Sequence, residues 1–203
     1  DIVNNTADEM DDWIDMFSTL KAKEGKYAIL GNHDYGDYMD WKSPQDKVEN
    51  FEAVKNIHKK IGFDLLLNEN RYLEKDGQKI ALVGVENWGK GFKQKGDLKK
   101  ASENITNEDF KILMSHDPSH WDAEVKNADL HHHLTLSGHT HGMQAGFILK
   151  NRKWSPIKYK YKQWAGLYQE NNQFLYVNRG IGWMGFPGRI GVRPEITCIE
   201  LEN

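Results

Sequence analysis

Cysteine is nearly absent from this sequence: Cys198 is the only one among 203 residues. A single cysteine cannot form a disulfide within the chain, so packing and hydrogen bonds must hold the fold together. Cys198 lies in the run Ile196-Thr-Cys-Ile-Glu200, which is typical of a strand, and we expect its side chain to be buried.

Long apolar runs are also missing. No stretch of 18 consecutive apolar residues occurs, so the sequence as given offers no candidate for a membrane-spanning helix. It carries no recognisable signal peptide either. The sequence begins at Asp1 and not at Met, and we therefore expect a cut N-terminus, with any targeting segment or membrane anchor upstream of it.

Neither sign of charge dominates, because the net charge is −3 and the pI is about 6.3. Non-specific binding to nucleic acid needs a strongly basic face, and this balance argues against it. Hydrophobic residues make up 38% and charged residues 28%, as in a globular protein. The length suits a single domain that spans residues 1–203.

Hydrophobic periodicity predicts alternating strands and helices in the first half of the chain and a β-rich second half. Residues 7–23 repeat apolar side chains every three or four positions, and Ser43-Pro44 is typical of a helix start. We expect helices at 7–23, 44–61 and 119–127, and strands at 26–30, 63–67, 71–75, 79–85, 110–114, 130–136, 173–178 and 195–201. This order predicts one α/β domain with layered sheets.

Polar clusters follow three of the short apolar strands. They are Asn32-His33-Asp34, His116, and the pair His139 and His141. In open α/β sheets, sites gather beyond the carboxyl ends of strands. Alternate residues of an extended segment project to the same side, so the paired histidines are expected to converge. Each cluster alone also fits an Asx turn, a capping histidine or surface histidines in a turn; the shared position favours one site.

The side chains in these clusters can all bind a metal ion through nitrogen or oxygen. Imidazole nitrogens together with amide and carboxylate oxygens suit Mn, Fe, Zn or Co, and no thiolate is available. Two such ions about 3.5–4 Å apart can activate a water and stabilise an in-line displacement at phosphorus. A single structural metal ion is the alternative. Three further histidines at 131–133 are interpreted as a polar entry to a strand.

The clusters resemble the calcineurin-like metallophosphoesterases. That family carries, in order, Asp-x-His, Gly-Asp, Gly-Asn-His-Asp or Gly-Asn-His-Glu, a lone His, and Gly-His-x-His; Gly31–Asp34, His116 and Gly138–His141 match the last three. The resemblance implies a layered α/β/β/α sandwich. It also implies hydrolysis of phosphodiester or pyrophosphate bonds by a metal-activated hydroxide, with two divalent transition metals such as Mn, Fe or Zn.

The metal ligands carry over position by position. By resemblance, Asn32, His116 and His139 bind the second metal ion, and His141 binds the first. Asp1 resembles the aspartate of the Gly-Asp block, which bridges both ions, and it lies 31 residues before Asn32 with one amphipathic helix between them.

His33 and Asp34 are the expected catalytic residues. By resemblance, His33 protonates the leaving oxygen while Asp34 holds its ring in one tautomer. The Asp-x-His block has no counterpart, because it would lie before residue 1, so we expect the given chain to hold one ion or none tightly and to be weakly active or inactive. A non-catalytic metal-binding module of the same fold is the alternative, and the retained proton donor argues against it.

Arg179 and Arg189 are the expected substrate residues, because a planar guanidinium suits phosphate. Their alternative role is that of solvated loop arginines. The nearby Trp183 belongs to an apolar cluster with Met184 and Phe186, which either packs under the loop or forms an exposed apolar patch.

The ending from Leu175 to Gly182 also resembles a bacterial branch of the family whose members tend to be membrane-associated. Some of them cleave the pyrophosphate of UDP-diacylglucosamine. The resemblance implies a phosphate-ester substrate, lipid-linked in that branch, with peripheral membrane contact and either a cytoplasmic or a membrane-associated location. Lys158–Lys162 is predicted as a strand whose lysines face an anionic membrane or protect a sheet edge.

Overall fold

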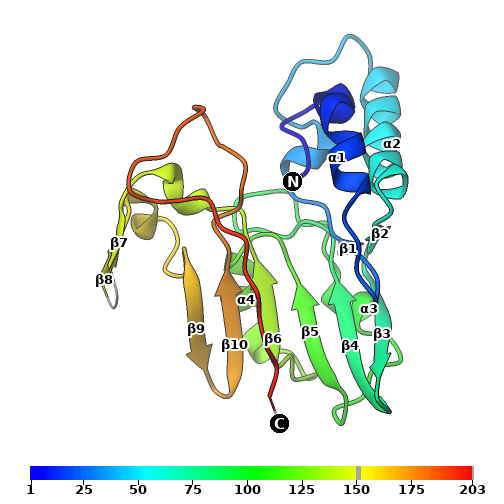
Figure 1. The fold of residues 1–203 in the computed structure, drawn as a ribbon, viewed down its shortest axis with the longest axis vertical. Helices are drawn as coiled ribbons and strands as arrows, with labels where there is room; N and C mark the ends of the chain where they lie inside the picture. The colour runs from blue at the N-terminus through cyan, green and yellow to red at the C-terminus, as the bar shows by residue number, and fades with distance from the viewer. Residues whose placement is uncertain (150–151, 203) are drawn as a thin grey trace.

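Four parallel strands form the centre of the main sheet, and an antiparallel strand closes each edge (Figure 1). The computed structural model describes residues 1–149 and 152–202. Its six-stranded sheet has the order β3-β4-β5-β6-β10-β9. The strands are β3 (Glu69–Lys75), β4 (Gln78–Gly84), β5 (Phe110–Met114), β6 (Leu134–Ser137), β9 (Gly166–Glu170) and β10 (Gln173–Val177). Because β4, β5, β6 and β10 run parallel, the residues that follow them meet along one edge of the sheet.

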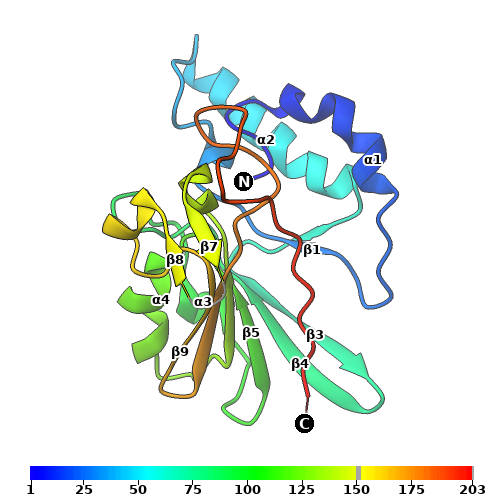
Figure 2. The ribbon, with the colours of Figure 1, turned by 60° about the vertical axis from the view of Figure 1, so that its left-hand side comes forward.

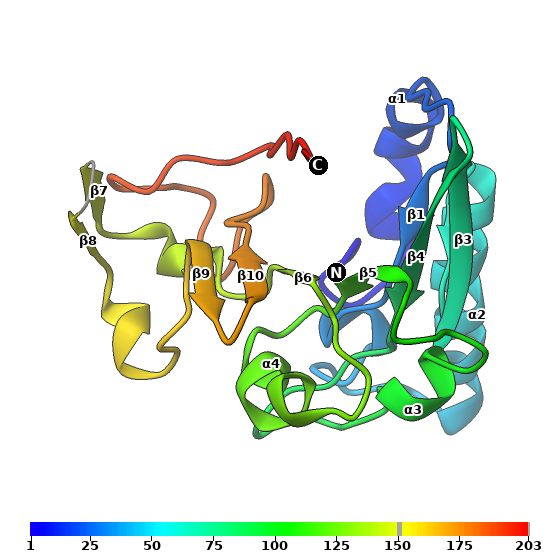
Figure 3. The same cartoon turned by 90° about the horizontal axis from the view of Figure 1, so that it is seen from below.

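The main hydrophobic core lies between this sheet and two short helices, α3 (Leu98–Ala101) and α4 (Ser119–Ala123), which cover one face (Figure 3). A 3-10 helix, η3 (Val125–Asn127), follows α4. Leu113 of β5 and Leu175 of β10 are fully buried, and Trp121 of α4 packs in the same cluster. Burial of such side chains contributes about 1.5–3 kcal/mol each and holds the strand ends in place.

A separate group of N-terminal helices stands at the carboxyl edge of the parallel strands (Figure 1). It contains η1 (Ala7–Trp13), α1 (Ile14–Ser18) and α2 (Pro44–Lys60). They share their own apolar cluster, formed by Val3, Met10, Val54, Ile57 and Ile61. The short strands β1 (Tyr27–Ala28) and β2 (Asp64–Leu65) pair in parallel, and η2 (His33–Tyr35) lies between β1 and α2.

The second predicted helix is confirmed and the first is shorter than expected. Ser43 caps α2 by accepting a hydrogen bond from the Asp46 amide, and Pro44 occupies its first turn. The helix predicted at 7–23 begins at Ala7 as a 3-10 helix but ends at Ser18. The hydroxyls of Ser18 and Thr19 bond backbone carbonyls there, which competes with continuation of the helix.

The β-rich second half contains two elements that project from the main sheet, β7 (Phe147–Leu149) and β8 (Arg152–Trp154) (Figure 2). Two 3-10 helices flank this pair of strands in the sequence, η4 (His141–Gln144) before it and η5 (Pro156–Tyr159) after it. The strand predicted at 158–162 is therefore wrong. Ser155 accepts from the Ile157 amide and Pro156 follows it, so this sequence starts a helical turn.

The strand predicted at 195–201 is also wrong, because no ladder partner forms along it. Glu195 pairs instead with Arg179, and Thr197 accepts from the Asn178 amide group. Ile196 is 90% exposed, and Cys198 is exposed where we expected burial. Alternating apolar residues form a strand only where a neighbouring strand offers its edge.

The predicted mixed α/β fold is confirmed by the central sheet and its helices. Within the described residues, no helix combines the length and apolarity needed to cross a membrane.

His132 makes the stability of this fold depend on pH. Its ring is fully buried before β6, 3.3 Å from the Ser102 hydroxyl oxygen, and burial lowers its pKa to about 4. Unfolded His132 binds a proton below about pH 6.5, whereas folded His132 does not until about pH 4. The stability that this neutral ring supports is therefore present above pH 6.5 and is lost as the pH falls toward 4.

We expect His132→Gln to reduce the loss of unfolding free energy between pH 7 and pH 5 by about 2 kcal/mol, because glutamine does not titrate. Urea denaturation of both proteins at the two pH values measures this difference. The same loss in the variant as in the unsubstituted protein would contradict the assignment.

Candidate metal centre

Four side chains from distant parts of the sequence converge at the carboxyl edge of the parallel strands. Asn32 precedes η2, His116 follows β5, His139 follows β6, and Asp1 joins them from the N-terminus. Asn32 Oδ1 lies 3.1 Å from His116 Nε2 and 2.9 Å from His139 Nδ1, and these two nitrogens are 3.1 Å apart. Asp1 Oδ2 lies 3.0 Å from His116 Nε2. The expected ligands of the second metal ion are thus brought together.

The protonation of the two imidazoles fits a metal ion. Burial lowers the pKa of His116 well below its ordinary value and that of His139 to about 3, so both rings are neutral at pH 7. Asp1, His116 and His139 each offer one ligand atom, all within 4.8 Å of one another. Lone pairs of nitrogen and oxygen that face one shared space suit a divalent transition metal.

Tyr161 and Asp117 fix which nitrogen of His139 is free. The Tyr161 hydroxyl donates to Asp117 Oδ2 at 3.1 Å and lies 2.8 Å from His139 Nε2. Burial, followed by the Asp117 charge, raises the pKa of Tyr161, so this hydroxyl keeps its proton. Since that proton goes to Asp117, the hydroxyl accepts the Nε2–H of His139, and Nδ1 keeps its lone pair toward Asn32.

Sequence reasoning missed both of these residues. Asp117 directly follows the expected ligand His116, and this position next to a ligand could have pointed to a role in the site. Tyr161 lies outside every motif, and no pattern in the sequence points to it.

Gly31 makes room for the cluster. A Cβ atom at this position would lie 2.2 Å from Asp1 Oδ1 and 2.6 Å from His116 Cε1. Both distances are far below van der Waals contact, so a larger residue would displace one of these side chains.

Asp34 does not hold the His33 ring, which corrects the expectation. His33 Nδ1 lies 2.9 Å from the Asn4 carbonyl oxygen. The buried Asp34 carboxylate accepts instead from the backbone amides of Gly31 and Ile2, at 2.7 Å each. Burial opposes its charge, but the hydrogen bonds from these amides favour the charged form and help to lower the pKa of Asp34. Because the Asn4 carbonyl oxygen accepts the Nδ1–H of His33, this carbonyl and not the Asp34 carboxylate orients the ring.

The Gly-His-Thr-His segment is not extended, so the expected convergence by alternation is wrong. His139 and His141 both have positive φ, at 65° and 48°, and Thr140 between them is helical. Such left-handed conformations cost non-glycine residues about 1–3 kcal/mol each. Of the two histidines, His139 belongs to the group whose ligand atoms lie within 4.8 Å of one another, and His141 does not.

His141 lies to one side of the cluster. It lines a cavity together with Asp1, and its Nδ1 is buried with no hydrogen-bond partner among the described residues. Burial, with Arg189 as the next cause, lowers its pKa to about 4. An unpartnered, neutral ring nitrogen is a free ligand, and it fits the expectation that His141 serves a different ion from His139.

The two expected substrate arginines already have partners. Arg179 forms an ion pair with Glu195 at 2.5 Å. Arg189 donates to the carbonyl oxygens of Arg179, Gly180 and Gly182. Their contacts stabilise the loop that follows β10, and their role in phosphate binding stays a prediction.

Comparison with known proteins accounts for this arrangement. The model of the calcineurin-like phosphoesterase family matches residues 1–143, which contain Asp1, Asn32, His116, His139 and His141. This chain belongs to that family.

Curated members of the family align with nearly the whole chain. This chain is 32% identical over 192 residues to the uncharacterized metallophosphoesterase YkuE of Bacillus subtilis, and the alignment covers 94% of this chain and 60% of that protein. YkoQ of the same organism is 25% identical, with 93% and 64% covered. The phosphodiesterase YaeI of Escherichia coli is 27% identical, with 92% and 62% covered. The chain thus spans less than two thirds of these relatives, and no solved structure matches it.

We expect Gly31→Ala to weaken Mn²⁺ binding by roughly tenfold or more, because the new methyl group overlaps Asp1 and His116. Gly138→Ala is the matched control: its Cβ would meet nothing closer than the Asn178 carbonyl oxygen at 4.0 Å. Isothermal titration calorimetry compares the two variants. Equal affinities would show that Gly31 does not make room for a metal site.

We expect Tyr161→Phe to weaken Mn²⁺ binding by about 10–100-fold, because His139 Nε2 loses its hydrogen-bond partner at 2.8 Å and keeps only Asp117 Oδ2 at 3.4 Å. In the metal-free protein, ¹⁵N NMR of the ring should show a mixture of tautomers where the unsubstituted protein has mainly Nε2–H. Tyr159→Phe, at a tyrosine that is 79% exposed, is the control. An unchanged ring spectrum in Tyr161→Phe would contradict the role of this hydroxyl.

Proposed function

We propose that this chain is a metal-dependent hydrolase of phosphodiester or pyrophosphate bonds. The convergence of Asp1, Asn32, His116 and His139 supports this proposal most directly, since four donor atoms from distant parts of the sequence meet in one place. A scaffold that only bound partners would not need two neutral imidazoles at this position.

The residues divide between two ions. In the intact protein, Asn32, His116 and His139 would hold one ion, His141 would take part in holding the other, and Asp1 would contribute to both; the contact of Asp1 with His116 and its place beside His141 support this role. Divalent ions at such a site supply a nucleophile by lowering the pKa of water and withdraw charge from the phosphoryl oxygens.

His33 is the proton donor of the proposal. Its Nδ1–H donates to the Asn4 carbonyl oxygen at 2.9 Å, which leaves Nε2 for the substrate. In the imidazolium form, Nε2–H donates to the leaving oxygen as the phosphorus–oxygen bond breaks. The Tyr38 ring lies 4.6 Å away, centroid to centroid, and limits rotation of the imidazole.

In the intact protein, we expect His33→Ala to lower kcat for bis-p-nitrophenyl phosphate with Mn²⁺ by about 10²–10⁴-fold, which is the usual contribution of a general acid. The affinity for Mn²⁺ should stay within about twofold, because the hydrogen bond from His33 to Asp1 comes from its backbone amide, which alanine keeps. His131→Ala is the control, since His131 precedes β6 and belongs to no part of the site. Equal kcat for His33→Ala and the unsubstituted chain would eliminate this role.

A further inference from the structure

Tyr38 contacts both a residue of the candidate metal centre and the proposed proton donor. The Nδ2–H of Asn32 donates to the Tyr38 hydroxyl oxygen, with 2.7 Å between nitrogen and oxygen. The Tyr38 ring also packs against the His33 ring, with the two centroids 4.6 Å apart and the ring planes tilted by 42°. One side chain thus touches the two neighbouring residues on which the proposed reaction depends.

The backbone after η2 explains how Tyr38 reaches this position. Gly36 ends η2 in a left-handed conformation, with φ at 61°, and its amide donates to the His33 carbonyl oxygen at 3.0 Å. The Gly36 carbonyl oxygen accepts from Trp41 Nε1 at 2.7 Å. The turn brings Tyr38 back toward Asn32 and His33, and the hydrogen bond from the indole holds the turn in place.

Asp37, which precedes Tyr38 in the sequence, anchors the same segment. Its carboxylate forms ion pairs with Lys47 of α2 and with Lys93 of the segment that follows β4, the latter at 2.8 Å. Tyr38 is therefore placed by contacts on both sides of it before any ligand binds. A side chain that is already in position loses less entropy when it contacts a ligand.

The Tyr38 hydroxyl has a proton that is still free to be donated. Asn32 turns its Oδ1 toward the ring nitrogens of His116 and His139, so its amide nitrogen faces Tyr38, and the hydroxyl oxygen accepts there. A phenol oxygen can accept a hydrogen bond and donate its own proton at the same time. Among the described residues, that proton has no acceptor, and Tyr38 is 49% exposed.

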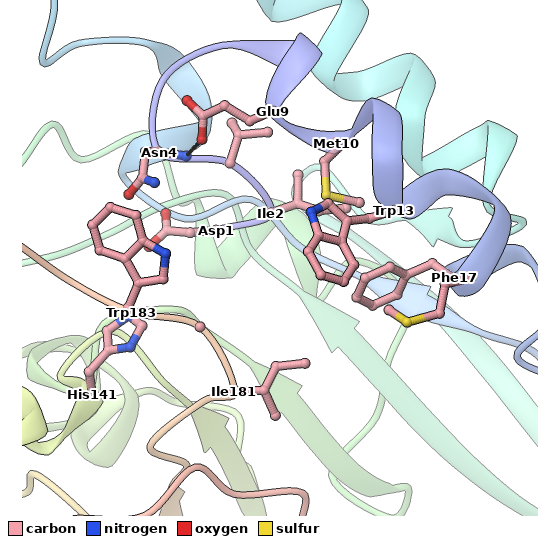
Figure 4. Close-up of a pocket in the computed structure, with 13 residues that line it drawn as sticks. Asp1, Ile2, Asn4, Glu9, Met10, Trp13, Phe17, His141, Ile181 and Trp183 are labelled. Atoms are coloured by element: carbon pink, nitrogen blue, oxygen red, sulfur yellow. Dashed lines mark hydrogen bonds between the residues drawn. The ribbon is translucent and has the colours of Figure 1, made fainter. Parts of the chain in front are cut away.

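His33 meets the start of the chain through its other contact. Its Nδ1 donates to the carbonyl oxygen of Asn4, which lines the cavity beside Asp1 and His141 (Figure 4). Tyr38 is not among the described residues that line this cavity. Since Tyr38 contacts both Asn32 and His33, a phosphoryl group that lies between the ligand cluster and His33 has the Tyr38 hydroxyl as a neighbour.

We propose that the Tyr38 hydroxyl donates a hydrogen bond to a nonbridging phosphoryl oxygen of the substrate. The inference rests on the proposed function and adds a substrate contact to it. Hydrogen bonds to a charged oxygen are about twice as strong as those between neutral groups, so a phosphoryl oxygen is a better acceptor than water. The contact holds the phosphoryl group in one orientation, with its leaving oxygen toward His33.

Tyr38→Phe tests this contact, because phenylalanine keeps the ring against His33 and removes only the hydroxyl. In the intact protein at saturating Mn²⁺, we expect the Kd for inorganic phosphate, measured by isothermal titration calorimetry, to rise by about tenfold or more. The kcat/KM for bis-p-nitrophenyl phosphate should fall by a similar factor. Tyr27→Phe is the control: it removes a hydroxyl that donates to the Glu24 carbonyl oxygen at 2.9 Å, and it should change neither value.

Two outcomes overturn the inference and leave the proposed function in place. One is a Tyr38→Phe protein whose phosphate affinity and kcat/KM both stay within about twofold of the unsubstituted protein. The other is a loss at limiting Mn²⁺ that disappears at saturating Mn²⁺, since the hydroxyl would then only orient Asn32. Failure of the unsubstituted intact protein to hydrolyse the ester contradicts the proposed function, whereas the phosphate affinities still decide whether Tyr38 makes this contact.

Discussion

The site depends on the hydrogen bonds that the buried carboxylate of Asp34 accepts from the backbone. This carboxylate accepts from the amides of Gly31 and Ile2, and so it joins the start of the chain to the turn that carries Asn32. A fully buried carboxylate is tolerated only where several donors compensate for its lost hydration, and here the backbone provides them. With the two segments joined, Asp1 Oδ1 accepts from the His33 amide at 2.8 Å while its Oδ2 faces His116. One aspartate that contacts no ligand side chain therefore determines where two of them lie.

The sequence was sufficient to predict the strand ends and most residues of the cluster, because parallel strands deliver their last residues to one edge and the motifs mark those positions. It could not predict how the backbone leaves the strands. His139 and His141 look like members of an extended run in the sequence, and only the folded structure shows that both have left-handed backbone conformations. Tyr161 was beyond reach for a similar reason: its contact with His139 spans 22 residues and follows no periodic pattern. The missing strand at 195–201 reflects the lack of a neighbouring edge, which the sequence of a strand does not encode.

In the segment after β6, hydrogen bonds from neighbouring residues stabilise a strained backbone. Besides the two histidines, Met143 and Gln144 also have positive φ, at 51° and 55°. Hydrogen bonds hold this conformation from several sides: Thr140 donates to the Trp164 carbonyl oxygen, and Ser155 donates to that of Gly142, both at 2.8 Å. Gln144 adds its contacts to the loop of Trp183. The ligand nitrogens and the loop of Trp183 thus belong to one connected unit, and a change in either affects the other.

The charges of the site explain why an ion and the fold stabilise each other. Asp1, Asp34 and Asp117 place three carboxyl groups around imidazoles that burial keeps neutral, so no side-chain cation within this cluster offsets them. Neutral imidazoles supply lone pairs without repelling a cation, and the carboxyl groups attract it. A ligand that binds only the folded chain raises the free energy of unfolding by RT ln(1 + [L]/Kd). Asp1 is placed by the hydrogen bond of Ile2 to Asp34, by its own contact with the His33 amide and by the burial of Val3 in the apolar cluster of the N-terminal helices, so an ion that binds Asp1 adds its stability to that of this packing.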